Sequence, residues 1–266
     1  MRWIIIGTGN VAWHLTRALM QAGEDCIGVV SRELDKAKVF ANALSPALLA
    51  YSFEELVGNL PLNVDVYLLA VADDALIDTA SKIACLPPTL ALHTSGTRPL
   101  IALNGLAEAG WKTGVFYPLQ TLSRQKAVDW KQIPLLIESE NLPTLQELEE
   151  VAKRISSTVV RANSEQRRWL HLVAVMTSNF MHHLITIGST LLEKQNLQFT
   201  LLEPLLRETL EKALMPYPAT TQTGPAKRGD THTIENHIAL LQDFPAWQNV
   251  YKALTNSLIE LYSVKD

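Results

Sequence analysis

The sequence predicts a doubly wound, mostly parallel α/β sheet followed by an all-α second domain. Three observations carry this prediction. In the first half, short apolar runs alternate with segments whose apolar residues recur at helical spacing, as in the strand–helix units of a parallel sheet. Residues 64–71 are almost continuously apolar, as expected of a strand that is buried on both faces. After about residue 160 the strand signals end and long helical patterns take over.

The elements expected in the first half follow one another in a regular order. The first helix is expected to stop at Gly23, because glycine commonly terminates helices. Asp73 or Asp74 is expected to cap the helix that follows the apolar run 64–71. The predicted strands are 2–7, 26–31, 64–71, 89–96, 113–120, 133–139 and 157–162, and the predicted helices are 10–23, 33–44, 73–84 and 143–155.

The second half is predicted to contain helices alone. They are expected over 164–196, 200–213, 231–241 and 247–264, with a proline- and glycine-rich loop between the second and the third. We therefore place one domain at 1–158 and the other at 159–266. The helices of the second domain, notably over 170–192 and 254–262, carry more apolar residues than one small helical layer can bury. A homodimer through these C-terminal helices is expected, since large exposed apolar patches mark interfaces and two-fold dimers are the commonest oligomers.

Composition argues against several classes of partner. The 266 residues include 23 Lys and Arg against 27 Asp and Glu, with no long run of one sign, so no basic face for nucleic acid is expected. Two cysteines in a chain of this size do not make a disulfide framework, and a reducing cytoplasm is the expected compartment. No metal site is expected, since H-E-x-x-H is absent and neither cysteine has a C-x-x-C partner.

No membrane association is expected either. The first residues lack the basic region, separate apolar core and cleavage site of a secretory signal. The most apolar stretch, 170–192, is interrupted by His171, Ser178, Asn179, His182 and His183. A buried helix tolerates these groups better than a membrane span would.

A glycine-rich turn follows the first predicted strand. Residues 7–12, GTGNVA, fit the pattern G-x-G-x-x-[G/A], in which Gly7 permits the tight turn, Gly9 lets a pyrophosphate approach, and Ala12 lets the helix pack closely on its strand. The alternative is a tight turn in an α/β protein that binds no nucleotide, but the position between a strand and a helix favours a dinucleotide site. The residues expected at the pyrophosphate are Gly7, Thr8, Gly9, Asn10 and Val11.

The end of the second predicted strand indicates which nucleotide binds. NAD sites place a carboxylate there for the ribose hydroxyls, whereas this chain has Ser31 and Arg32, which suit the 2′-phosphate of NADP. Glu33 could be that carboxylate one position late, or the first acidic residue of the next helix. NADP is therefore the predicted cofactor. Ala70, Val71 and Ala72 are expected on its adenosine or ribose side, and His93 and Ser95 on its nicotinamide side.

Several motifs together resemble one family. They are GTGNVAWHL, VVSR, LLAVADDAL, LHTSG, FYPLQT, HLVAVMTSNF and GPAKRGDTHTIENH, and they extend over nearly the whole chain. The family consists of NADP oxidoreductases that pair a Rossmann-like domain with a helical C-terminal domain of unknown function. It is similar in architecture to pyrroline-5-carboxylate reductases and to 6-phosphogluconate and β-hydroxyacid dehydrogenases. The resemblance implies the fold and the cofactor, but no particular substrate.

One stripe of the first long C-terminal helix carries polar residues. At about 100° per residue, Ser178 and His182 fall within about 20° of the direction of His171, and Asn179 lies about 80° round. The stripe either forms an interhelical hydrogen-bond network or lines an active-site cleft. The related dehydrogenases carry K-x-x-x-N on the corresponding helix; Asn179 matches the asparagine, but Val175 replaces the lysine. His171 is then the nearest candidate proton donor, with Ser178 and Asn179 as further catalytic candidates.

Two further segments have both a catalytic and a structural interpretation. His93 and Ser95 follow a predicted strand, where ligands bind in open α/β sheets, but they could equally be a packed histidine and a plain turn. Arg228 could bind a substrate carboxylate with Asp230 orienting it, or Arg228 could be a surface charge and Asp230 a helix cap.

The predicted function is NADP-dependent hydride transfer to or from a small carbonyl, imine or alcohol substrate, in a cleft between the two domains. Two alternatives remain open at this point. One is an NADP-binding sensor or scaffold without turnover, which the missing lysine favours. The other is a reductase that passes hydride between NADP and a deazaflavin.

Overall fold

The computed structural model describes residues 1–58 and 63–262, and the chain divides into two compact units, Met1–Thr177 and Ser178–Asp266. The described part of the first unit contains one eight-stranded sheet of order β3-β2-β1-β4-β5-β6-β7-β8. Neighbouring strands are parallel except β6 and β7. The strands are β1 Arg2–Ile6, β2 Asp25–Val30, β3 Leu49–Tyr51, β4 Val66–Leu69, β5 Leu90–His93, β6 Lys112–Pro118, β7 Leu135–Glu138 and β8 Val159–Arg161.

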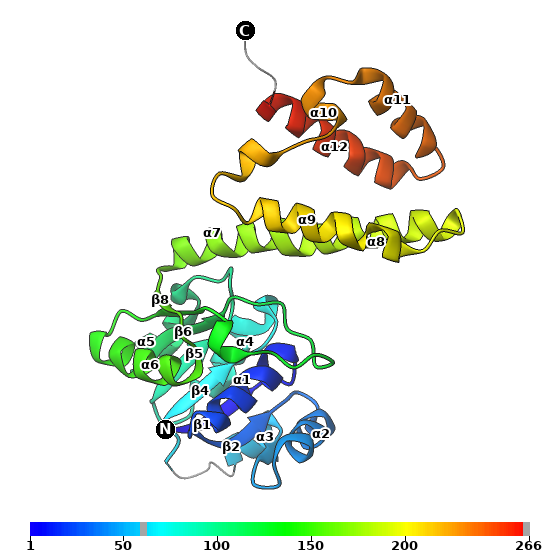
Figure 1. Ribbon diagram of the computed structural model, residues 1–266. Coiled ribbons are helices and arrows are strands. Elements are labelled where there is room, and N and C mark those ends of the chain that lie inside the picture. Colours follow the sequence, from blue (N-terminus) through cyan, green and yellow to red (C-terminus); the bar gives the residue numbers. More distant parts are fainter. Residues whose placement is uncertain (59–62, 263–266) are drawn as a thin grey trace. The chain divides into compact units, whose positions relative to one another are not determined.

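Helices cover both faces of this sheet (Figure 1). Trp3 and Ile5 of β1 point to the face covered by α1, α2 and α6, while Ile4 and Ile6 point to the face covered by α3, α4 and α5. Both faces of β1 are therefore buried, which explains its unbroken apolar sequence. The helices of this unit are α1 Asn10–Gln21, α2 Leu34–Leu44, α3 Phe53–Gly58, α4 Leu76–Ile83, α5 Asn104–Glu108, α6 Leu142–Ile155 and α7 Ser164–Ala174.

The order of the strands reverses at β1, which lies between β2 and β4. In open α/β sheets, ligands bind outside the carboxyl ends of the strands at such a switch point. The residues that follow β1, β2 and β4 are therefore expected to form a ligand site.

The described residues of the second unit form helices and no strand. Its helices are α8 Phe180–Lys194, α9 Glu203–Ala213, α10 Pro225–Arg228, α11 Thr231–Leu240 and α12 Pro245–Tyr262. The predicted fold class, a mostly parallel doubly wound sheet followed by an all-α region, is confirmed.

The domain boundary at residue 158 stays a prediction; the compact units divide after Thr177, because β8 pairs with β7 and α7 is bonded to the sheet unit. The secondary structure differs from the predicted layout in several places. The helix expected over 164–196 contains a π-helical turn at Val175–Asn179, between α7 and α8. The short strand β3, which extends the sheet beyond β2, was not predicted.

One helical run among the described residues, Ser164–Lys194, is long and apolar enough to cross a membrane by length and composition alone. A mostly buried core helix of a soluble protein passes the same test, but none of the apolar window of this run is buried, so the predicted buried helix is not observed. A single run of this kind is weak evidence for a span. Arg167, in the first turn of this run, is almost completely buried against the sheet unit. The absence of membrane association stays a prediction.

Candidate active site

The glycine turn joins β1 to α1 in a conformation that only glycine tolerates. Gly7 has φ +116°, and a Cβ atom at this position would lie 2.2 Å from the carbonyl oxygen of Ala70. A Cβ on Gly9 would meet nothing within 4 Å, so the space beside this residue is open. Gly9 precedes α1 without a side-chain cap, and the first N–H groups of the helix are left for a ligand.

A pocket of about 240 Å³ lies against this turn and the carboxyl ends of β1, β2 and β4. Most of the residues predicted to bind the cofactor line it, whereas Asn10 and Val11 lie beside it in the first turn of α1. The lining residues are Ile6, Gly7, Thr8, Gly9, Val30, Ser31, Arg32, Glu33, Lys36, Phe53, Ala70, Val71, Ala72, Ala75, Asp78 and Thr79.

Two lining residues carry the groups predicted to bind the 2′-phosphate of NADP. Ser31 brings a hydroxyl and Arg32 a guanidinium to the pocket, and their contact with the phosphate stays a prediction. Lys36, which the sequence analysis missed, adds a second cation from the first turn of α2. In the sequence, Lys36 could have been recognised as a candidate by its position four residues after Arg32. Glu33 is paired with Lys36, with 2.6 Å between Nζ and Oε1.

His93 and Ser95 have the geometry of a packed histidine and a turn. His93 is completely buried, and its Nδ1 accepts the N–H of Ser95 at 3.1 Å. Burial, with a smaller contribution from Arg167, lowers the pKa of His93 to about 3, so the ring is neutral near pH 7. The Oγ of Ser95 accepts the N–H groups of Thr97 and Arg98 at 3.1 and 2.9 Å. Contact of His93 and Ser95 with the cofactor stays a prediction.

His171 meets Tyr117 at the carboxyl end of β6. The Nδ1 of His171 lies 3.0 Å from the Tyr117 hydroxyl, and burial raises the pKa of that hydroxyl above its ordinary value. Gly96 permits this arrangement, since a Cβ there would lie 2.5 Å from His171 Nδ1 and 2.9 Å from Tyr117 Cζ. The glycine of the HTSG segment therefore leaves room for a histidine–tyrosine pair. Tyr117 was visible in the FYPLQT segment, but nothing in the sequence indicated its partner.

Arg167 holds the first turn of α7 against the sheet unit. Its side chain is 1% exposed and donates to the carbonyl oxygens of Ser95 and Arg98 at 3.1 and 2.6 Å. A third hydrogen bond, of 2.9 Å, reaches the carboxylate of Glu138 at the end of β7. Glu138 also accepts the backbone N–H and the hydroxyl of Ser164, which begins α7. His171, one turn after Arg167, is thereby positioned over the HTSG segment.

The other catalytic candidates belong to the second unit. Ser178 is half-buried in the π-helical turn, and Asn179 is exposed at the end of that turn. Arg228 is exposed at the end of α10. Asp230 caps α11, since its carboxylate accepts the N–H and the hydroxyl of Thr233 at 3.0 and 2.7 Å, and these bonds lower its pKa. Catalytic roles for these four residues stay predictions.

Two family models match the chain. Residues 2–91 match the family described as NADP oxidoreductase, coenzyme F420-dependent, and residues 133–258 match a domain of unknown function, DUF2520. No curated protein matches the chain.

Solved structures similar to this one include oxidoreductases of the same architecture. A putative NADP oxidoreductase from Bacteroides fragilis is 35% identical over 97% of this chain and 98% of its own, with a TM-score of 0.86. A reductive aminase from Aspergillus terreus, in complex with NADPH and ethyl levulinate, is 15% identical over 97% and 92% of the two chains, with a TM-score of 0.67. An imine reductase from Streptomyces aurantiacus is 14% identical over 97% and 93%, with a TM-score of 0.65. The last two are similar in fold.

Proposed function

The chain belongs to the family of NADP oxidoreductases that join a Rossmann-like domain to a helical domain of unknown function, and on this premise we propose that it transfers a hydride between NADP(H) and a small carbonyl, imine or alcohol. The family confirms the predicted cofactor and an oxidoreductase activity. The substrate class and the predicted substrate cleft between the domains are parts of the proposal.

The nucleotide pocket is the observation that carries this proposal. The Gly7–Gly9 backbone and the N–H groups of α1 would bind the pyrophosphate, and Ser31, Arg32 and Lys36 would bind the 2′-phosphate. The nicotinamide, when bound, supplies or accepts the hydride. The pocket fits this cofactor because it is open at Gly9 and is lined by Arg32, just after β2, and by Lys36, in the first turn of α2.

His171 is the proposed proton donor. A carbonyl oxygen or an imine nitrogen takes up a proton when the neighbouring carbon receives a hydride, and histidine exchanges protons near neutral pH. His171 is half-buried, and its hydrogen bond to Tyr117 fixes the orientation of the ring. The bond also gives the imidazole a second group with which it can share a proton.

Replacing Arg32 tests the choice of nucleotide. We expect Arg32→Ala to weaken NADPH binding roughly ten- to a hundredfold, because it removes a charge-assisted hydrogen bond of about 1.5–3 kcal/mol. NADH has no 2′-phosphate, so its affinity should hardly change. Fluorescence titration with both nucleotides measures the difference, and an equal loss for both would show that Arg32 does not contact the 2′-phosphate.

The reaction itself is tested by NADPH oxidation with a panel of cyclic imines, aldehydes, ketones and 2-oxo acids. We expect at least one member to support turnover. Tight NADPH binding without turnover on any acceptor would favour the sensor or scaffold alternative.

A deazaflavin is the second candidate acceptor. The description of the family matched by residues 2–91 names coenzyme F420, although these residues form the nucleotide-binding part of the chain. Adding an oxidised deazaflavin to the panel separates this candidate from a metabolite reductase, because NADPH-dependent loss of the visible deazaflavin absorption would occur without any other substrate.

A reducing, cytoplasmic location also forms part of the proposal. Cys26 is a buried free thiol and Cys85 is an exposed one. An exposed unpaired thiol is more compatible with a reducing compartment than with an oxidising one.

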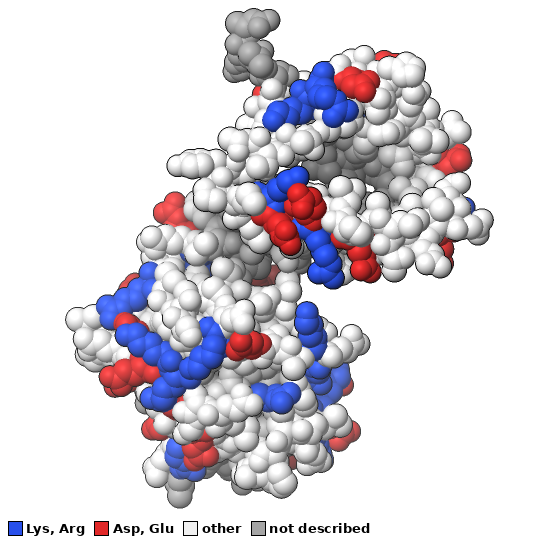
Figure 2. All heavy atoms as spheres, in the orientation of Figure 1, with Lys and Arg blue, Asp and Glu red and all other residues white. Residues whose placement is uncertain are grey.

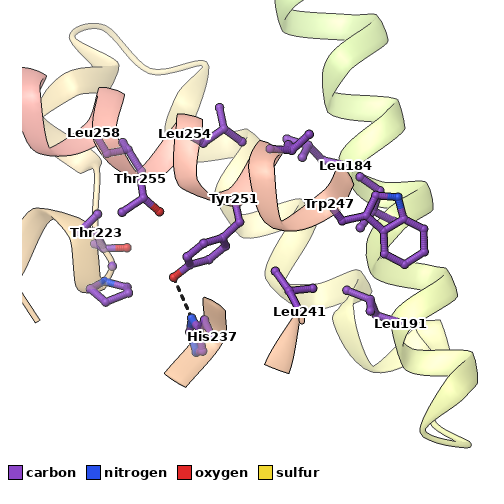
Figure 3. A pocket seen from close by; sticks show the side chains of 15 residues that line it. Leu184, Leu191, Thr223, His237, Leu241, Trp247, Tyr251, Leu254, Thr255 and Leu258 are labelled. Atoms are coloured by element: carbon purple, nitrogen blue, oxygen red, sulfur yellow. Dashed lines mark hydrogen bonds between the residues drawn. The ribbon is translucent and has the colours of Figure 1, made fainter. Parts of the chain in front are cut away.

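The second unit supports a homodimer through its helices. None of the residues of α8 and α9 is buried, although Phe180, Met181 and Leu184 of α8 are apolar. Much of the surface of this unit that Figure 2 shows carries no charged side chain. A hollow of about 390 Å³, lined mainly by apolar side chains of α8 and α12, adds further apolar surface (Figure 3). A second copy covering α8 would bury these side chains.

We expect a dimer by light scattering at micromolar concentration. Phe180→Glu should weaken association, because a carboxylate would be placed in the proposed interface, where its desolvation is costly. The matched control is Ile77→Glu on α4, which changes an apolar residue of similar exposure in the sheet unit. A monomeric wild-type chain would contradict the proposal.

A further inference from the structure

The connection from β6 to β7 reaches back to the nucleotide-binding turn. Arg124, in this connection, donates a hydrogen bond to the carbonyl oxygen of Thr8, between the two glycines of the turn. Its guanidinium lies 4.8 Å from the ring centre of Trp13 on α1 and 5.7 Å from that of Phe40 on α2. An exposed arginine from a distant part of the chain is therefore held beside the turn by a hydrogen bond and two aromatic rings.

A second contact anchors the same connection. The Nε2 of His14, a buried residue of α1, lies 2.9 Å from the carbonyl oxygen of Ser123. Adjacent residues of the connection are thus bound to the glycine turn and to the helix that follows it. The backbone beside Arg124 is therefore bound to α1, while its side chain is bound to the glycine turn.

The chemistry of Arg124 fits an anion at the turn. A guanidinium has five N–H donors in one plane, so stacking on aromatic rings leaves its edge available for hydrogen bonds. The carbonyl oxygen of Thr8 would by itself repel a phosphate beside Gly9, and Arg124 compensates that partial negative charge. Arginine on a diphosphate forms charge-assisted bonds, which are among the strongest hydrogen bonds in proteins.

We propose that Arg124 is a binding residue for the diphosphate of the dinucleotide. The assignment rests on the proposed NADP site, and it adds a cation from a part of the chain outside the glycine motif. The diphosphate is common to NADPH and NADH, so Arg124 strengthens the binding of both. It differs in this respect from Arg32, which acts on the 2′-phosphate alone.

Binding measurements without turnover test the assignment. Arg124→Met keeps an unbranched apolar stem beside Trp13 but removes the charge. Calorimetric titrations would use four probes: NADPH, NADH and ADP-ribose, which contain the diphosphate, and 2′-AMP, which does not. We expect Arg124→Met to weaken the first three roughly ten- to a hundredfold and to leave 2′-AMP unchanged. Arg124→Lys should restore part of the loss. Arg17→Met, which changes an exposed arginine on the same helix α1, is the matched control.

The possible outcomes distinguish a failure of the Arg124 assignment from a failure of the NADP site on which it rests. Unchanged binding of NADH and ADP-ribose to Arg124→Met would overturn it. An equal loss for 2′-AMP would also overturn it, because the arginine would then act by holding the connection in place. Failure of the wild-type chain to bind any of the four probes would overturn the NADP site itself.

Discussion

His171→Ala is expected to lower turnover by about 10²–10⁴-fold, the usual contribution of a positioned proton donor. NADPH affinity should change little, because the residues proposed to hold the phosphates lie at the glycine turn and at the end of β2. Steady-state rates with the best acceptor of the panel and NADPH titrations on the same samples measure the two effects. A parallel loss of affinity and rate would indicate that His171 supports the cofactor site as a whole.

Tyr117→Phe provides the matched control for that experiment. The substitution keeps the aromatic ring beside Gly96 and His171 but removes the hydroxyl that lies 3.0 Å from the imidazole. If the pair transfers the proton together, we expect a smaller loss of turnover and a shifted pH–rate profile, with stability nearly unchanged. A wild-type profile would show that His171 acts without Tyr117.

Asn179→Ala extends the test to the second unit. A role in catalysis predicts retained NADPH affinity with reduced turnover. A structural role predicts the reverse, with unchanged activity per folded molecule and a loss of stability. Because Asn179 is exposed in the described conformation, a structural loss should be small.

The glycine turn and the residues proposed to bind the nucleotide around it could be recognised from the sequence because their signals are local. Gly7 and Gly9 are two positions apart and lie next to the strand and helix that they join. Ser31 and Arg32 follow directly from the second strand of the same unit. For such residues, neighbours in sequence are also neighbours in space, so short sequence patterns are sufficient to recognise them.

The proposed proton-transfer pair could not be predicted in the same way. Tyr117 and His171 are brought together by the packing of α7 on the sheet unit, and they lie far apart in sequence. Arg167 was one of two adjacent arginines in an ordinary helical pattern, and only burial distinguishes it from exposed Arg168. Likewise, Arg124 lies in a connection without a recognisable motif, and its proposed role follows from its contacts with the glycine turn, α1 and α2.

Arg167 should have the largest effect on stability. We expect Arg167→Met to lower the free energy of unfolding by about 3–5 kcal/mol, the usual cost of removing one partner from a buried ion pair. The reason is that the substitution leaves the Glu138 carboxylate and the carbonyl oxygens of Ser95 and Arg98 without this donor. The bonds from Ser164 continue to stabilise Glu138, which favours the lower end of that range. Urea denaturation at neutral pH provides the measurement.

Two further variants identify the cause of that loss. Arg168→Met changes an exposed arginine at the next position of α7 and should have little effect. Glu138→Gln in the Arg167→Met background removes the unpaired carboxylate and keeps an oxygen that can accept from Ser164. If the unpaired charge dominates, the double variant should be more stable than Arg167→Met alone. If it is equally unstable, the lost bonds to Ser95 and Arg98 dominate instead, and Arg167 acts mainly by fastening α7, and with it His171, to the HTSG segment.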